Sequence, residues 1–291
     1  MRITEYLRLI RIQQWYKNLV IFLPLFFVGE LLKVAILGQV LIGFVALCLV
    51  SSSNYIINDI IDAKKDRLHP EKKYRPIASG KVSMWEGGIL AFITLALALL
   101  IAYPYGIFFL SCVIFLFILT FLYSIYLKNE PVLDVIIIAM NFVVRAVSGA
   151  FIIHVIVSPW LILCPFFLAL FLAVGKRDAD LKVLRSNASK HKEVLKFYDP
   201  KTTNGLMIIS TTCLIIAYSL YAFSRTELLL LTLPFAIYTI YRYYSLVNSG
   251  SKIARHPELA YKDWRIVIAI LLWAIMIFVI FYCLIGRVSI I

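Results

Sequence analysis

The sequence predicts an all-α fold, a polytopic membrane bundle of about nine transmembrane helices. Of its 291 residues, 62% are apolar and 15% are charged, and the mean hydropathy is +0.91. A soluble domain is about 45–50% apolar and about 25% charged, so this composition excludes an ordinary soluble enzyme and a disordered chain. The apolar residues gather in repeated blocks of about 18–22, the length that crosses a bilayer. Helices are favoured because lipid cannot satisfy an open sheet edge.

The predicted spans follow one another with mostly short connections, and we expect one integral-membrane domain over residues 1–291. The spans cover residues 19–37, 38–58, 87–103, 106–127, 132–152, 157–175, 205–223, 227–245 and 266–286. The connections at 103–106 and 223–227 are short, so the helices on either side of each should pack antiparallel.

Positive charge predicts the orientation. The chain has 29 Lys and Arg against 16 Asp and Glu, a net charge of +13. With the N-terminus inside, nearly all of these cations fall in inside segments; only Lys33, Arg225 and Arg287 lie outside, and Arg145 lies within a span. Cytoplasmic segments of membrane proteins collect Lys and Arg, so we predict N-in and C-out, and the charge does not indicate nucleic acid. The long loops then share the cytoplasmic face, which favours an enzyme over a channel or carrier that opens to both sides.

The strongest motif lies at the inner end of the second predicted span and reads Asn54-Tyr-Ile-Ile-Asn58-Asp59-Ile-Ile-Asp62-Ala-Lys-Lys-Asp66. Helical spacing places these polar side chains on one face. Carboxylates so close repel one another, so a cation is expected among them. Hard oxygen ligands favour Mg²⁺, and we predict Asn58, Asp59, Asp62 and Asp66 as its ligands. The alternative is a solvated acidic helix end, although acidic residues at membrane depth are usually functional.

A basic loop follows these carboxylates, and a second polar motif precedes the first span. The loop reads Arg67-Leu-His-Pro-Glu-Lys-Lys-Tyr-Arg-Pro-Ile-Ala-Ser-Gly-Lys81, and Arg and Lys are the side chains that hold phosphate. The N-terminal motif contains Gln14, Lys17 and Asn18, which could add donors to an anion. The alternatives are a positive-inside flank for the loop and an interfacial aromatic belt for the Trp-Tyr pair between Gln14 and Lys17.

Two further spans carry charge at or within the membrane. Asp134, Asn141 and Arg145 lie on one stripe of the fifth span, and an intramembrane Asp and Arg should face the bundle interior. They are expected either to form buried structural pairs with other spans or, for Arg145, to bind a phosphate. The sixth span ends in Gly-Lys176-Arg177, which suits either an anionic lipid headgroup or a plain stop-transfer flank.

Together these motifs resemble the UbiA superfamily of intramembrane prenyltransferases over essentially the whole chain. The Asn58-Asp59-x-x-Asp62-x-x-x-Asp66 run and the inward loops carry that resemblance. Within the superfamily, the other motifs resemble the decaprenyl-phosphate phosphoribosyltransferase branch. They are Gln14-Trp15-x-Lys17-Asn18, His69-Pro-x-Lys72-x-x-Arg75-Pro-Ile-Ala, Leu127-Lys128-x-x-Pro131-Val-x-Asp134, Arg145 and Gly175-Lys176-Arg177. Ile12 departs from this branch, in which proline often follows the arginine.

The resemblance implies an Mg²⁺-dependent transfer of 5-phosphoribose from phosphoribosyl diphosphate to a polyprenyl phosphate of decaprenyl type, at the cytoplasmic face of the cell membrane. Attack opposite the leaving diphosphate would invert ribose C1. Asp59, Asp62 and Asp66 are then the catalytic carboxylates. The residues expected at the donor's phosphates are Gln14, Lys17, Asn18, Asn54, Lys72, Lys73, Tyr74 and Arg75. Those expected at the acceptor or a second phosphate are Tyr123, Lys128, Asp134, Arg145, Lys176 and Arg177.

Two alternatives stay open. A conventional prenyltransferase would move an isoprenoid from a prenyl diphosphate to an aromatic or glycerol-type acceptor. Such enzymes resemble two-sided clamps with a second Asp-rich motif after the sixth span, where this chain has Asp178 and Asp180, two apart and on different helix faces. One carboxylate clamp and one cationic clamp suit a metal-diphosphate donor and a phosphate acceptor better. A transporter or lipid-binding protein would form no Mg²⁺-dependent product, and a homo-oligomer is possible in each case.

Overall fold

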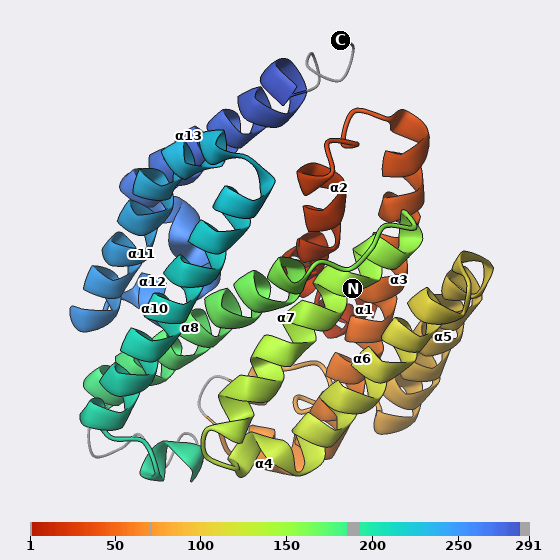
Figure 1. The fold of residues 1–291 in the computed structure, drawn as a ribbon. Coiled ribbons are helices and arrows are strands. Elements are labelled where there is room, and N and C mark those ends of the chain that lie inside the picture. Colours follow the sequence, from red (N-terminus) through yellow and green to blue (C-terminus); the bar gives the residue numbers. More distant parts are fainter. Residues whose placement is uncertain (1, 70–71, 185–192, 286–291) are drawn as a thin grey trace. The chain divides into compact units, whose positions relative to one another are not determined.

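The computed structural model describes residues 2–69, 72–184 and 193–285, and within them the chain forms helices and connecting segments without strands (Figure 1). The predicted all-α class is therefore confirmed. The chain divides into two compact units, residues 1–128 with 141–157, and residues 129–140 with 158–291. Helix α7 (Leu133–Ile152) contributes residues to both units. The single domain over residues 1–291 remains a prediction.

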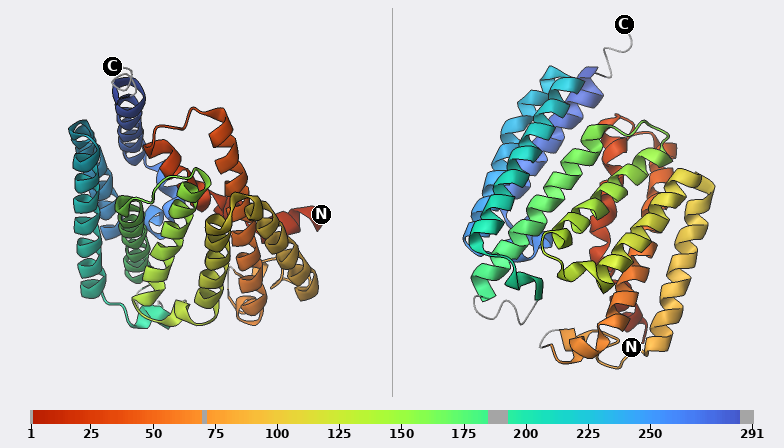
Figure 2. Two further views of the ribbon diagram at one scale, coloured as in Figure 1. Left: turned by 45° about the vertical axis from the view of Figure 1, so that its right-hand side comes forward. Right: turned by 60° about the horizontal axis from the view of Figure 1, so that its bottom comes forward.

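The first unit is built around the long helix α3. Its elements are α1 (Arg2–Ile10), a 3₁₀ helix (Ile12–Phe22), α2 (Leu23–Phe27), α3 (Val34–Ile61), α4 (Ala63–Arg67), a 3₁₀ turn (Lys72–Tyr74), α5 (Met84–Ala102), α6 (Ile107–Ile125) and the latter part of α7. Helices α3, α5 and α6 lie side by side (Figure 2). Their apolar core includes the fully buried Leu47, Phe109 and Leu116.

The second unit packs α8 against α10, and α11 against α13. Its elements are α8 (Pro159–Leu184), a 3₁₀ helix (Glu193–Lys196), α10 (Pro200–Arg225), a 3₁₀ helix (Glu227–Thr232), α11 (Leu233–Asn248), α12 (Lys252–Arg255), a 3₁₀ helix (Pro257–Lys262), α13 (Trp264–Phe278) and a π-helical end (Val279–Ile285). Phe171, Met207 and Val247 lie in its buried core.

Within the described parts of the chain, seven helices are long and apolar enough to cross a membrane. Two predicted spans differ from a single long helix. The span 227–245 changes from a 3₁₀ helix to an α-helix. The span 19–37 also changes from a 3₁₀ helix to an α-helix, but this α-helix ends at Phe27 and α3 already begins at Val34, so the predicted boundary at 37/38 is wrong. The α-helices begin at Leu23 and Leu233 with a proline in their first turn. Proline lacks the backbone N–H and fits only the first turn, so it marks a new helix. The end of the last predicted span, residue 286, lies outside the described residues, and the count of nine and the orientation remain predictions.

Close contact between α7 and the N-terminal segment requires glycine at position 149. A Cβ atom built on Gly149 would lie 2.0 Å from the backbone oxygen of Ile21, which cannot move as a side chain can. We expect Gly149→Ala to destabilise the fold by about 1–3 kcal/mol through overpacking. Gly88 of α5 has nothing within 4 Å of such a Cβ, so Gly88→Ala is the matched control. Thermal unfolding of the detergent-purified variants checks this, and equal melting temperatures would contradict it.

The start of α13 depends on a single carboxylate. Asp263 Oδ1 accepts a hydrogen bond from the backbone N–H of Ile266 at 3.1 Å, and Oδ2 accepts one from Arg242 Nη2 at 2.7 Å. The hydrogen bond from Arg242 lowers the pKa of Asp263 below its ordinary value. Because the folded-state pKa is depressed, the carboxylate stabilises the fold above about pH 4, and this contribution is lost as the pH falls through the folded-state pKa.

We therefore expect Asp263→Ala to lower the melting temperature at pH 7 and to differ less from the unsubstituted protein below about pH 4. The lost helix cap alone corresponds to about 0.5–2 kcal/mol. Asp263→Asn keeps a cap acceptor and removes the charge, so it separates the two contributions. A melting-temperature difference that stayed constant between the two pH values would show that the charge of Asp263 plays no part.

Candidate active site

The predicted acidic motif lies where α3 ends and α4 begins. The α-helix stops at Ile61, Asp62 is its C-terminal cap residue, and α4 starts at Ala63. The interruption is one residue long: Asp62 keeps α-helical backbone angles, and the backbone N–H groups of Asp62 and Asp66 still bond to the carbonyls four residues earlier, at 2.9 and 2.8 Å. Asp59 and Asp66 share one cation, whereas Asp62 contacts another.

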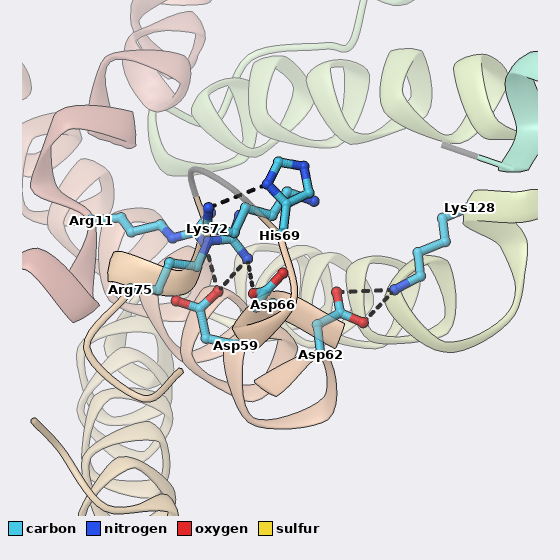
Figure 3. Close-up of polar contacts among 8 residues, drawn as sticks. All are labelled: Arg11, Asp59, Asp62, Asp66, His69, Lys72, Arg75 and Lys128. Carbon is cyan, nitrogen blue, oxygen red and sulfur yellow. Dashed lines mark hydrogen bonds and ion pairs between the residues drawn. The ribbon is translucent and has the colours of Figure 1, made fainter. Parts of the chain in front are cut away.

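Asp59 and Asp66 converge on one guanidinium group (Figure 3). Arg75 Nη1 lies 3.1 Å from Asp59 Oδ1 and 2.6 Å from Asp66 Oδ2. Both carboxylates are buried, with exposed fractions of 2% and 3%. The sequence placed these residues in one motif, but the structure adds that Arg75 from the basic loop lies between them.

Asp62 points elsewhere and binds Lys128, whose Nζ lies 3.0 and 3.1 Å from its two carboxylate oxygens (Figure 3). In the chain as described, no three Asp, Glu, His or Cys side chains gather around one point as a ready set of metal ligands. Each of the three carboxylates is paired with a Lys or Arg side chain in this structure. The assignment of Asn58, Asp59, Asp62 and Asp66 as Mg²⁺ ligands remains a prediction.

Arg11 is a site residue that the sequence analysis did not single out. Its Nη2 lies 2.5 Å from Asp59 Oδ1, and its guanidinium carbon lies 5.0 Å from the centre of the Tyr55 ring. Its backbone has a φ of 55°, which is uncommon for a residue with a side chain. This turn joins α1 to the following 3₁₀ helix. The available signal was its place three residues before Gln14, in the motif already considered for anion binding.

A second polar cluster lies deeper in the first unit. Arg145 is 6% exposed and donates from Nε to Asn18 Oδ1 at 2.7 Å and from Nη1 to the carbonyl of Asn141 at 2.9 Å. Its guanidinium carbon also lies 5.6 Å from the centre of the Phe142 ring. Ser51 Oγ donates to the same Asn18 oxygen at 3.4 Å. Arg145 thus contacts an amide oxygen, a backbone carbonyl and an aromatic ring. Among the described residues, no carboxylate is paired with it.

The structure also describes other residues that were predicted to bind phosphate of the donor or the acceptor. Asn54 is buried on α3, whereas Asn58, Gln14 and Lys17 are partly exposed. Lys72 donates its backbone N–H to His69 Nδ1 at 3.3 Å, and the Nζ of Lys73 lies over the exposed ring of Tyr74. Tyr123 is partly buried on α6. Their binding roles remain predictions.

In the second unit, Asp134 forms a buried structural group with Arg177 and Tyr198. Arg177 approaches Asp134 Oδ2 with Nε at 3.0 Å and Nη2 at 2.9 Å, and Tyr198 donates its hydroxyl to Asp134 Oδ1 at 2.6 Å. Tyr198 also accepts from the backbone N–H of Val132 at 2.9 Å. Burial and the hydrogen bond to Asp134 raise the pKa of Tyr198. Of the alternatives weighed for Asp134, this arrangement matches a buried pair with another span.

The Gly-Lys-Arg-Asp-Ala-Asp segment of α8 does not form a second carboxylate cluster in the described residues. Asp178 binds Thr203 Oγ1 at 2.7 Å and Lys182 Nζ at 2.5 Å, while Asp180 binds Arg255 Nε at 3.0 Å. The two carboxylates therefore point to different partners. Lys176 is partly exposed beside them, and its role at a phosphate remains a prediction.

The fold and these contacts describe an α-helical membrane protein with carboxylates and guanidinium groups clustered at a helix end. The model of the UbiA prenyltransferase family matches residues 19–255. The chain belongs to the UbiA prenyltransferase family.

Relatives and solved structures agree with this assignment. Decaprenyl-phosphate phosphoribosyltransferases from Mycolicibacterium smegmatis and Mycobacterium tuberculosis are 33% and 30% identical to the chain, over 93% and 91% of it and 90% of each relative. A UbiA homolog from Archaeoglobus fulgidus, solved bound to GPP and Mg²⁺, has the same fold with a TM-score of 0.73 at 23% identity, covering 95% of this chain and 99% of that one. The predicted family and UbiA-like fold are confirmed.

Proposed function

We propose that this protein transfers 5-phosphoribose from phosphoribosyl diphosphate to a polyprenyl phosphate in the cell membrane. The observation that carries the proposal is the similarity, over nine-tenths of both chains, to relatives named decaprenyl-phosphate phosphoribosyltransferase. The first unit supports it with two groups suited to anions. One combines carboxylates with Arg11, Arg75 and Lys128, and the other is the buried Arg145.

The carboxylates at the helix end fit a divalent cation. Asp59 Oδ1 and Asp66 Oδ2 already converge on one positively charged nitrogen, and hard oxygen donors around one positive charge suit Mg²⁺. Asp59 and Asp66 would hold the ion, with Asp62 and Asn58 as further oxygen donors near the same helix end. Mg²⁺ bound there would offset the charge that develops on the leaving diphosphate. Arg11, Arg75 and Lys128 would then be available to phosphate oxygens.

The reaction needs little proton transfer from the protein. The bond between ribose C1 and the diphosphate oxygen breaks, and its electron pair leaves with the diphosphate. A phosphate oxygen of the lipid forms the new bond to C1 from the opposite face through an oxocarbenium-like transition state, which inverts C1. Because the lipid phosphate is already ionised, its attack requires no strong general base. The side chains therefore act by binding and by electrostatic stabilisation.

We also propose that this chemistry takes place at the cytoplasmic face. Both Arg75 and Lys128 lie in segments that the distribution of Lys and Arg assigns to that side. The donor is water-soluble and would enter from the cytoplasm, whereas the isoprenoid tail of the acceptor would remain among the apolar helices.

A labelled-donor assay tests the proposal. Membranes containing the full chain are incubated with Mg²⁺, decaprenyl phosphate and phosphoribosyl diphosphate carrying ¹⁴C in its ribose. A labelled lipid that requires Mg²⁺ and the polyprenyl phosphate is the expected result. A parallel reaction with labelled geranyl diphosphate and an aromatic acceptor tests the conventional prenyltransferase alternative. Product from the prenyl donor alone would contradict the proposal, and no product from either donor would favour a transporter or lipid-binding protein.

A further inference from the structure

Asn54 has a buried oxygen that finds no hydrogen-bond partner in the described part of the chain. The residue is 3% exposed, and its Nδ2 donates to the carbonyl of Val50 at 3.4 Å. Its Oδ1 is fully enclosed and, among the residues that the structure describes, accepts no hydrogen bond. An unsatisfied buried acceptor costs free energy, so a polar side chain here needs a reason beyond packing.

The chemistry of this oxygen restricts its partner. The Nδ2 group faces a carbonyl oxygen, which fixes the amide orientation because the reverse orientation would bring two acceptors together. Oδ1 is therefore the atom left for a ligand, and it can only accept a hydrogen bond. A phosphate oxygen is itself an acceptor when ionised, so it is a poor partner. A hydroxyl group is a suitable one.

Along the axis of α3, Asn54 lies between the residues that take part in the two cationic clusters. On one side along the helix, Asp59 contacts Arg11 and Arg75. On the other, Ser51 contacts Asn18, which binds Arg145. Ser51 and Asp59 are separated by about 12 Å at the rise of an α-helix, and Asn54 lies between them. Phosphoribosyl diphosphate has the same order of groups, with a diphosphate and a phosphate on either side of a ribose that carries two free hydroxyls.

We propose that Asn54 Oδ1 accepts a hydrogen bond from a ribose hydroxyl of the donor and selects phosphoribosyl diphosphate over a prenyl diphosphate. This inference rests on the proposed function and deepens it. A prenyl chain offers only C–H groups at this position and would leave the buried oxygen unpaired. A site built to bind a hydroxyl group rejects a ligand that lacks it, because its own polar atom then stays unsatisfied.

The test compares phosphoribosyl diphosphate with its 2-deoxy and 3-deoxy analogues on the full chain. The unsubstituted protein should favour the natural donor by about ten- to hundredfold in kcat/KM over the analogue that lacks the hydroxyl bound by Asn54. Leucine has nearly the same shape as asparagine but no polar side-chain atoms. The Asn54→Leu variant should therefore lose that preference and use the natural donor and this analogue equally poorly. Asn54→Ala is a second variant with a smaller side chain. Ser53→Ala is the matched control, since Ser53 Oγ donates to the carbonyl of Ala91 on α5, and it should keep the preference.

Calorimetric binding of inorganic pyrophosphate with Mg²⁺ supplies a readout besides turnover. Pyrophosphate has no sugar hydroxyl, so its affinity should be unchanged in Asn54→Leu. Equal use of the natural donor and both deoxy analogues by the unsubstituted protein would overturn the inference, as would a preference that survives in both Asn54 variants. If transfer of phosphoribose is observed but these results appear, only the inference fails. If the unsubstituted protein transfers no phosphoribose, the proposed function fails and the inference fails with it.

Discussion

Asp59→Asn is expected to lower kcat for phosphoribosyl transfer by about 100-fold or more, the usual cost of removing one preorganised electrostatic group at a reacting centre. Asp59 shares Arg75 with Asp66, and the two carboxylates would share the divalent cation in the same way. The double variant Asp59→Asn with Asp66→Asn should therefore have about the same kcat as the less active of the two single variants. The effects of substituting residues that act as a unit do not add. Initial rates with the ¹⁴C-labelled donor measure this.

The matched control for Asp59 is Asp180, which is also paired with an arginine but lies in the second unit. Asp180 binds Arg255 on α12, with Nε of the arginine 3.0 Å from Oδ1 of the carboxylate. Asp180→Asn should leave the rate near that of the unsubstituted protein. Gel filtration in detergent establishes that each variant is folded before rates are compared. Full activity of Asp59→Asn in folded protein would remove Asp59 from the reaction.

Arg145→Gln is expected to lower kcat/KM by at least about tenfold while leaving the melting temperature unchanged or higher. The contacts of Arg145 are with Asn18, Asn141 and Phe142, so removing its charge leaves no buried carboxylate unpaired. An unpaired buried charge is costly to the fold, and its removal offsets the lost hydrogen bonds. The loss should appear mainly in KM, measured for the donor and for the acceptor separately, since Arg145 is proposed to bind a phosphate of one of them.

Arg177 provides the contrast, because it is a buried arginine with an acid partner. Arg177→Gln would leave Asp134, which is fully buried, without its cation. Breaking such a pair costs about 3–5 kcal/mol, so this variant should lose thermal stability. Melting temperatures measured by tryptophan fluorescence in detergent compare the two variants. A fall in stability for Arg145→Gln equal to that for Arg177→Gln would indicate that both arginines have structural roles.

The outcome for individual residues shows how far local patterns reach. The acidic run at Asp59 was found because charge at membrane depth is unusual. Arg75 was found because it belongs to the basic loop that directly follows this acidic run. Arg11 was not singled out, because its contact with Asp59 joins residues far apart in the chain. Asp62 was grouped with the other carboxylates because of its spacing along one helix, whereas its carboxylate binds Lys128 from a distant segment.

The sequence by itself determined that this is an all-α membrane protein of the UbiA type, because apolar block length, the distribution of Lys and Arg and the acidic motif are all properties of neighbouring residues. Only the tertiary structure decided the partners of each buried charge. It paired Arg177 with Asp134, and it placed Arg145 against an amide oxygen and a carbonyl oxygen. Among the described residues it left one oxygen of Asn54 without a hydrogen-bond partner. Ion pairs inside a protein depend on which helices approach one another, and the spacing of residues along one helix does not contain that information.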